Sequence, residues 1–204
     1  MSAPRTPRGR ATKERIVGVA AALMYERGVS AVSLDDVLLA SGAGKGQFYH
    51  YFSNRQELVA EVIRHQLDQV LREQKLFELD TWEGIHAWLE ALVGMQQNQR
   101  GFRGCPLGVI ASDVVEHGDV LRRSAADAFA LWESSVSAGL RLLQANGLLR
   151  TDADPDALAE TAIALLQGGY LLSSVKRNVR PMRSAVDAAE KHLESFRTIH
   201  DPGV

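Results

Sequence analysis

The sequence predicts an all-α protein of about nine helices, and three observations favour this fold class. Apolar residues recur at spacings of three and four along most of the chain, which is the period of an amphipathic helix. No segment shows the alternation with period two that is typical of strands. Glycines, prolines and capping residues separate the periodic segments. A length of 204 residues with 46% apolar content is typical of a globular chain of one or two domains.

The segment 33–58 predicts two short helices joined by a tight turn, with a longer helix directly after them. Ser33 suits the N-cap of the first helix, and Asp36, three residues later, completes a capping box. Gly42 is expected to end that helix, because glycine accepts the positive φ of a tight turn. The second helix is expected at about Lys45 to Tyr51.

Two short helices around a glycine turn form a helix-turn-helix, whose second helix lies in the major groove of DNA. The side chains of Lys45 and Gln47 suit the edges of bases, whereas the neighbouring polar groups suit phosphates. A capping box of Ser53 and Gln56 is expected to open the long helix at Asn54 and to present its N–H groups to an anion. The predicted DNA-binding residues are Arg10, Ser33, Gly44, Lys45, Gln47, Tyr49, His50, Tyr51 and Arg55. Phe48 and Phe52 are expected in the core instead.

This segment, together with residues 12–28, resembles the tetracycline-repressor-like (TetR) family of bacterial regulators. The resemblance is carried by Thr12, Ile16, Ala20, Ala21, Glu26 to Gly28, Ser33, Val37, Gly42, Lys45, Gly46, Tyr49, Tyr51, Phe52, Arg55 and Leu58. Two positions depart from the family pattern: Gly44 stands where a small polar cap is frequent, and Leu34 stands where a threonine is frequent. The resemblance implies a DNA-binding head, a helical body with a small-molecule cavity, and a dimer formed through the C-terminal helices.

Other functional classes fit the sequence poorly. The glycines around Lys45 could suggest a nucleotide-binding loop, but no Ser or Thr follows the lysine and the dinucleotide glycine spacing is absent. The sequence contains no nucleophile-elbow motif, no H-E-x-x-H and no cluster of Cys and His with metal-ligand spacing. We therefore expect no enzyme activity, no cofactor and no metal site.

Charge is divided unevenly along the chain. Residues 1–60 carry a net charge of +3 and the remainder carries −5, which together give the overall −2. The basic residues of the first fifteen positions are expected on or near phosphates, and residues 1–10 are expected to form a mobile arm. A single cysteine excludes an internal disulfide and suits a reducing cytoplasm. No secretory signal and no apolar run of about 18 residues is apparent, so the protein is expected to be soluble and cytoplasmic.

The expected organisation is a DNA-binding domain at residues 1–53 and an effector-binding and dimerisation domain at 54–204. Helices are expected at about 12–28, 54–75, 80 or 81 to 100, 105–116, 119–146, 154 onward and 181 onward. The last two carry regular apolar stripes, which predict either burial within one chain or a dimer interface. The dimer is favoured because a symmetric operator needs two heads. The predicted interface residues are Leu158, Ala162, Leu165, Gly169, Leu172, Val186, Ala189, Leu193 and Phe196.

The body is expected to bind a small, apolar or aromatic effector. Large apolar side chains would form the wall, and glutamines would orient the ligand by hydrogen bonds. The candidates are Trp88, Leu92, Met95, Gln96, Phe102, Cys105, Ile110, Trp132, Gln167 and Tyr170. A Trp or Met on a helix stripe is more often core than pocket wall, so fewer than half of these residues are expected to touch an effector. Cys105 raises a second possibility, because an Arg nearby and a helix N-terminus both lower a thiol pKa.

The sequence thus predicts a homodimeric, one-component transcriptional regulator, a repressor that a ligand releases from a palindromic DNA operator. Two alternatives stay open at this point. One is a repressor that senses oxidants or electrophiles through Cys105. The other is a helical ligand-binding protein without operator function.

Overall fold

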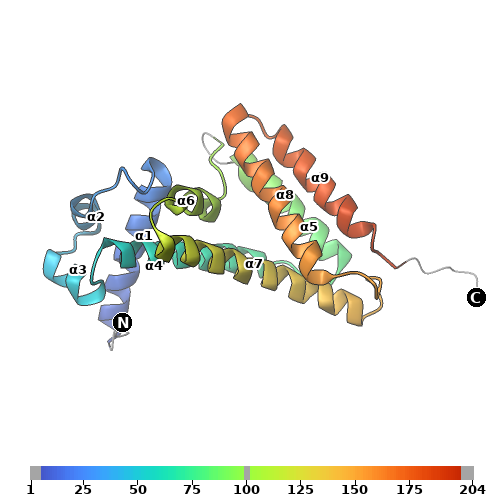
Figure 1. The fold of residues 1–204 in the computed structure, drawn as a ribbon, viewed down its shortest axis with the longest axis horizontal. Helices are drawn as coiled ribbons and strands as arrows, with labels where there is room; N and C mark the ends of the chain where they lie inside the picture. The colour runs from blue at the N-terminus through green and yellow to red at the C-terminus, as the bar shows by residue number, and fades with distance from the viewer. Residues whose placement is uncertain (1–5, 99–101, 199–204) are drawn as a thin grey trace, which may run out of the picture. The chain divides into compact units, whose positions relative to one another are not determined.

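The computed structural model describes residues 6–98 and 102–198, and in this part the chain forms nine α-helices (Figure 1). The prediction of an all-α fold is confirmed. The helices are α1 (Pro7–Arg27), α2 (Leu34–Ser41), α3 (Lys45–Tyr51), α4 (Arg55–Gln74), α5 (Trp82–Asn98), α6 (Pro106–Val114), α7 (Asp119–Ala145), α8 (Pro155–Lys176) and α9 (Arg180–Glu194).

The chain divides into two compact units that alternate along the sequence. The head unit contains the described part of Met1–Val70 together with Pro106–Phe129, and the body unit contains the described parts of Leu71–Cys105 and Ala130–Val204. Helix α6 therefore belongs to the same unit as α1 to α3. The functional division at residues 53 and 54 stays a prediction.

The core of the head unit is built from apolar faces of α1 to α4. Ile16, Ala20 and Met24 of α1 are fully buried, as are Phe48 of α3 and Leu58 of α4. These side chains are the helical stripe that the sequence shows, and α2 packs on α1. The short helices are therefore stabilised by burial of their apolar faces more than by their own propensity.

The first helix begins earlier than expected. Thr6 is its N-cap, with the hydroxyl accepting from the N–H of Gly9 at 3.1 Å, and Pro7 occupies the first turn. A proline is favourable there because its missing N–H would be unpaired in any case. Arg8 and Arg10 are therefore helical and not part of a mobile arm, which corrects the prediction for 6–10. Arg5 lies outside the described residues, as do Gln99 and Arg100 at the predicted end of the fifth helix.

The cap of α4 is displaced by one residue from its predicted place. Asn54 accepts from the N–H of Glu57 at 2.9 Å, and the Glu57 carboxylate accepts from the N–H of Ser53 at 2.7 Å. The predicted box of Ser53 and Gln56 is wrong. Asn54 and Glu57 have the same three-residue spacing, and an asparagine is at least as good an N-cap as a serine.

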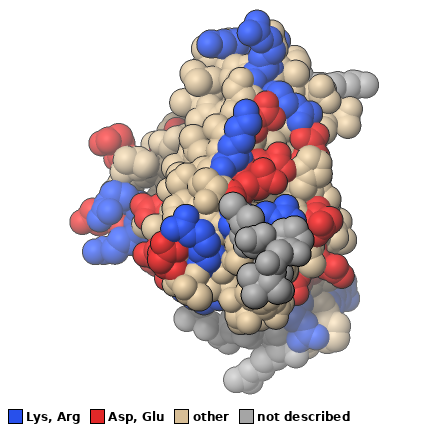
Figure 2. Space-filling view, turned by 90° about the vertical axis from the view of Figure 1, so that its right-hand side faces the viewer, with Lys and Arg blue, Asp and Glu red and all other residues tan. Residues whose placement is uncertain are grey.

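In the body unit, α8 and α9 form an antiparallel pair and α5 packs against α9 (Figure 1). Two ion pairs join α5 to α9: Arg183 with Glu90, and His86 with Glu190 at 2.5 Å. The hydrogen bond and charge of Glu190 raise the pKa of His86 above its usual value. Figure 2 shows acidic and basic side chains interspersed on the face that it presents.

Helix α8 is apolar on two faces. It is long and apolar enough to cross a membrane by length and composition alone, with a mean hydropathy of 1.2, but the side chains of one face are buried within the body unit. This feature was not expected from the sequence. Its outer face exposes Leu171 (63%), Leu172 (46%) and Val175 (71%). Neighbouring exposed apolar side chains of this kind often mark an interaction surface on a globular protein.

Candidate nucleic-acid interface

The helix-turn-helix of α2 and α3 is fixed by local hydrogen bonds. Ser33 and Asp36 form the predicted capping box, and the Ser33 hydroxyl holds the pKa of Asp36 below its usual value. Gly42 takes the left-handed conformation with φ of 62° and ends α2 as expected. The guanidinium of Arg15 on α1 donates to the carbonyl of Ser41, so it holds the turn against α1. The sequence had indicated a phosphate contact for Arg15.

Helix α3 has the predicted bounds and presents polar side chains above a buried aromatic base. Phe48 and Phe52 are buried, with ring centroids 5.1 Å apart, and this confirms their assignment to the core. Tyr49 stacks its ring edge-on against Phe48 and is 59% exposed. Lys45, Gln47 and His50 are also exposed, and Tyr51 is half-buried. The surface of α3 therefore offers donors and acceptors on a rigid support.

The start of α3 lacks a side-chain cap, as the sequence indicates for Gly44. Instead, the amide oxygen of Gln47 accepts from the N–H of Gly44 at 3.1 Å. The Nζ of Lys45 lies 3.2 Å from the carboxylate of Asp35, and both side chains are largely exposed. An exposed pair of this kind contributes little to stability, so the lysine is readily available to DNA.

Arg55 contacts the protein itself. Its Nη2 donates to the carbonyls of Val29 and Val32, at 3.1 Å for the latter, in the loop between α1 and α2. This differs from the phosphate contact expected from the sequence. The side chain joins the first turn of α4 to the loop that precedes α2, and thereby helps to set the position of the helix-turn-helix.

Replacing Arg55 by alanine should lower the free energy of unfolding by about 1.5–3 kcal/mol, because two partly buried carbonyls lose a charged donor. Operator affinity should fall by the same factor on every DNA sequence. Chemical denaturation and binding titrations over a range of salt would measure both. Arg64→Ala is the matched control on α4, since the Arg64 side chain is itself exposed and Glu61 keeps its pair with Lys13. A normal stability with a salt dependence flattened by about one charge would identify a phosphate contact instead.

Two side chains from α6 and the turn after it contact the same loop, and nothing in the sequence indicated this. The N–H of Val29 donates to the carboxylate of Asp113, and the hydroxyl of Ser30 lies 2.7 Å from Nε2 of His117. The peptide groups of Val29 are thus held on both sides, the N–H by Asp113 and the carbonyl by Arg55. The loop before α2 is therefore tied to both α4 and α6.

A hollow of about 270 Å³ between α1 and α4 is lined by charged side chains of both signs and their neighbours: Arg10, Lys13, Glu14, Val17, Glu61, Arg64, His65 and Asp68. Lys13 pairs with Glu61 at 2.9 Å and lies over the ring of Phe52 at 5.7 Å from its centroid. Arg10, one of the lining residues, is exposed to solvent. Its side chain is therefore accessible for the predicted contact with DNA.

The predicted effector residues are mostly buried. Gln96 and Gln167 stand out because they have buried amide atoms without hydrogen-bond partners among residues 6–98 and 102–198: both amide atoms of Gln96, and Nε2 of Gln167. Trp132, in contrast, is core, and its indole donates to Gln74 at 2.8 Å. The residues buried by at least nine-tenths are Trp88, Leu92, Gln96, Cys105, Ile110, Trp132 and Tyr170, whereas Met95, Phe102 and Gln167 are half-buried.

The predicted dimerisation stripe is mainly an internal face. Leu158, Ala162, Gly169, Val186, Ala189 and Leu193 are buried within this single chain, so they are not free to contact a partner. A Cβ at Gly169 would lie 2.7 Å from that of Ala185, which explains why a glycine allows α8 and α9 to approach. The predicted spacing of these apolar residues was correct, but the helix faces that they form pack against each other within one chain. Phe196 is half-buried.

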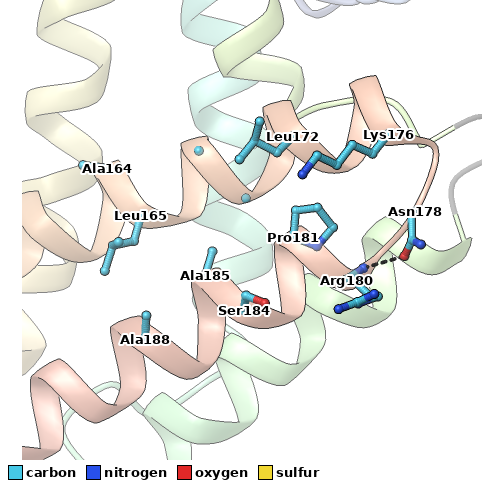
Figure 3. A pocket seen from close by; sticks show the side chains of 12 residues that line it. Ala164, Leu165, Leu172, Lys176, Asn178, Arg180, Pro181, Ser184, Ala185 and Ala188 are labelled. Atoms are coloured by element: carbon cyan, nitrogen blue, oxygen red, sulfur yellow. Dashed lines mark hydrogen bonds between the residues drawn. The ribbon is translucent and has the colours of Figure 1, made fainter.

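A groove on the outer side of α8 and α9 is open instead (Figure 3). Its volume is about 660 Å³, and it is lined by Ala164, Leu165, Gly168, Gly169, Leu172, Lys176, Asn178, Arg180, Pro181, Ser184, Ala185 and Ala188. A Cβ at Gly168 would meet no atom within 4 Å. The small residues leave room for another helix to approach both backbones closely.

Comparison with known proteins agrees with the assignment of a helix-turn-helix in the head unit. Residues 16–62 match the family model of bacterial regulatory proteins of the tetR family, and residues 81–188 match the LmrA/YxaF-like C-terminal domain of transcriptional regulators. The second match alone spans more than half of the chain.

Relatives match this chain over most of their length. An uncharacterized HTH-type transcriptional regulator of Mycobacterium tuberculosis (strain H37Rv) is 30% identical, covering 83% of this chain and 88% of the relative. The uncharacterized HTH-type regulator YxaF of Bacillus subtilis is 26% identical over 84% of this chain and 89% of its own. The crystal structure of a regulatory protein TetR from Rhodobacter sphaeroides superposes with a TM-score of 0.74, at 26% identity, over 89% of this chain and 98% of that one. On the evidence of its helix-turn-helix and of both family models, the chain belongs to the TetR family and is a helix-turn-helix transcriptional regulator.

Proposed function

We propose that the protein is a one-component repressor that binds a palindromic DNA operator as a homodimer and is released from it by a small ligand. The exposed polar surface of α3, supported by the buried Phe48, is the observation that carries the DNA-binding part. Helix α3 would enter the major groove, with Lys45 and Gln47 at base edges and with Arg10, Tyr49, His50 and Tyr51 near phosphates. The protein would act in the cytoplasm, where bacterial DNA is accessible.

The first experiment is a selection of bound sites from random duplex DNA at controlled salt. A dimer with two heads should select a two-fold symmetric consensus, with half-site centres about 34–36 Å apart or a multiple of that distance. Binding that is weak and independent of sequence would contradict operator function. It would favour the alternative of a ligand-binding protein that has kept the head.

We propose that the effector binds at the buried amide of Gln96. The two amide atoms of this side chain are sealed from solvent and unpaired within the described residues, and each such group costs about 1–3 kcal/mol. A ligand that offered one donor and one acceptor beside an apolar or aromatic body would remove this cost. The protein would then shift towards whichever conformation admits the ligand.

The signal would reach DNA through the loop between α1 and α2. Asp113 of α6 and Arg55 of α4 hold adjoining peptide groups of that loop. A small displacement of α6 would therefore act on the segment that leads into α2. We expect ligand binding to shift the equilibrium between the formed and the broken state of this contact between Asp113 of α6 and the loop.

Replacing Asp113 by alanine should accelerate hydrogen exchange at the N–H of Val29, because that group loses its acceptor. Exchange within α6 itself should change little. Ser112→Ala is a matched control on the same helix, since its hydroxyl donates only to the local carbonyl of Val109 among the hydrogen bonds described. Unchanged exchange at Val29 would show that α6 does not hold the loop in solution.

The structure gives little support to a thiol sensor. Cys105 is only 4% exposed, whereas reactive cysteines are partly accessible. A thiol probe applied to the folded protein would decide the matter. Rapid modification of Cys105, with DNA release that Cys105→Ser abolishes, would favour the redox alternative over a non-covalent effector.

A further inference from the structure

We propose that the hairpin of α8 and α9 recognises a second copy of itself by charge polarity, with the turn end of one hairpin against the open end of the other. The turn end is residues 166–186, and the open end is residues 154–165 together with 187–198. This inference rests on the proposed homodimer. It names the orientation in which two chains pair and the reason why they reject other pairings.

The two ends of the hairpin carry opposite net charges. The turn end has a net charge of +4 and contains no acidic residue; its basic residues are Lys176, Arg177, Arg180 and Arg183. The open end has a net charge of −4, from an excess of acidic over basic residues: Asp154, Asp156, Glu160, Asp187, Glu190 and Glu194 against Lys191 and Arg197.

Charges from both ends lie at the groove of α8 and α9. Lys176 and Arg180 line it close to the turn between the two helices (Figure 3). On α8, Glu160 lies one helical turn before Ala164, which also lines the groove. On α9, Asp187 lies one helical turn after a lining serine. The groove therefore has a basic end and an acidic end.

Three of these four charged side chains form no ion pair within one chain. Among the ion pairs of residues 6–98 and 102–198, none includes Glu160, Lys176 or Arg180. Glu160 and Lys176 are about 24 Å apart along α8, given its rise per residue. Burial and the neighbouring Glu160 raise the pKa of Glu133, as expected where two carboxylates lie near each other. A second chain can supply the opposite charges.

Two-fold symmetry leaves two limiting ways of packing two such hairpins face to face. The symmetry axis lies in the plane of contact and runs either along the hairpins or across them. An axis along the hairpins brings the two turn ends together, so that +4 meets +4 and −4 meets −4. An axis across them places each turn end on the partner's open end, where opposite charges attract. Charge therefore favours the second arrangement.

The sizes of the exposed side chains favour the same arrangement. The turn end exposes the large apolar residues Leu171, Leu172 and Val175. At the open end, the exposed apolar side chains of α8 and α9 are small: Ala157, Ala164 and Ala188. Large side chains packed against small ones let two helices approach closely, whereas large against large would hold them apart.

The orientation is tested with a variant in which the charges at the groove are reversed: Lys176→Glu, Arg180→Glu, Glu160→Lys and Asp187→Lys. Its net charge equals that of the wild type. The variant and a mass-tagged wild type are incubated together in equal amounts, and native mass spectrometry at low ionic strength quantifies the species. Each protein should form its own dimer. Mixed dimers should be rarer than random pairing gives, because they would join like charges.

Two further variants make the result specific. Arg72→Glu with Glu73→Lys exchanges two exposed charges of α4 that do not line the groove, and this control should mix randomly with the wild type. Lys176→Gln with Arg180→Gln is a milder change in case the reversed protein folds poorly. Its dimer dissociation constant should rise about 10- to 100-fold, since each lost ion pair occurs twice in a symmetric interface. Sedimentation velocity at two salt concentrations should also show a weaker salt dependence than in the wild type.

Mixed dimers at or above the random share would overturn this inference and leave the homodimer intact. A glutamine variant that pairs as tightly as the wild type, or more tightly, would overturn it as well. A wild-type protein that is monomeric in the same experiment would instead contradict the proposed homodimer.

Discussion

Leu172→Arg is expected to convert the proposed dimer into a monomer and to weaken operator binding by about 100-fold or more. Leu172 is 46% exposed and lines the groove of α8 and α9. An arginine there would place a charge in an apolar contact without a partner, which strongly opposes association. A single head then binds without the gain of about 10²- to 10⁴-fold that a linked second head supplies.

Sedimentation velocity and operator titrations would measure these two effects. Leu142→Arg is the matched control, because Leu142 on α7 is 53% exposed and does not line the groove. It carries the same change of size and charge and should stay dimeric. A Leu172→Arg protein that remains dimeric with unchanged affinity would place the interface elsewhere, and a monomeric wild type would contradict the dimer itself.

Gln96→Leu is expected to stabilise the protein and to abolish its response to effectors. Leucine removes two buried amide atoms that have no partner among the described residues. The free energy of unfolding should rise by about 1–3 kcal/mol, which raises the melting temperature by roughly 2–4 °C per kcal/mol for a chain of this size. Compounds that raise the melting temperature of the wild type through this site should have no effect on the variant, while operator binding persists.

Gln74→Leu provides the opposite case. Gln74 is also buried, but it accepts from the indole of Trp132 and donates to Ser135, both at 2.8 Å. The same substitution there removes both of these hydrogen bonds and should destabilise the protein. If Gln96→Leu destabilised it equally, the Gln96 amide would have partners in solution, and its assignment to an effector site would fail.

The local structure of the head could be predicted well because its signals are local. Ser33 with Asp36, and Gly42 with its positive φ, act over three or four residues, so spacing alone located α2 and the turn. The bounds of α3 followed from the same reasoning. The cap of α4 was misplaced by one residue because Ser53 and Asn54 are both good caps, and periodicity does not choose between neighbours.

Contacts between distant segments could not be predicted in this way. Asp113 and Val29 are far apart in the sequence, and the bond joins a side chain to a backbone group, which leaves no residue pattern. Arg55 illustrates a related limit: a basic residue near a DNA-binding helix suggests phosphate, but the structure provides nearer acceptors in its own backbone. The α8 stripe had the correct period, yet a period does not show whether the face packs within one chain or between two.

The exposed apolar face of α8 has a consequence for how such a regulator would respond to its own abundance. If this face is covered only when two chains pair, the DNA-binding species forms in proportion to the square of the free monomer concentration at low expression. A twofold fall in the free monomer concentration would then lower operator occupancy by up to fourfold. Cells that grow without making new protein would dilute the monomer and lose repression without any ligand.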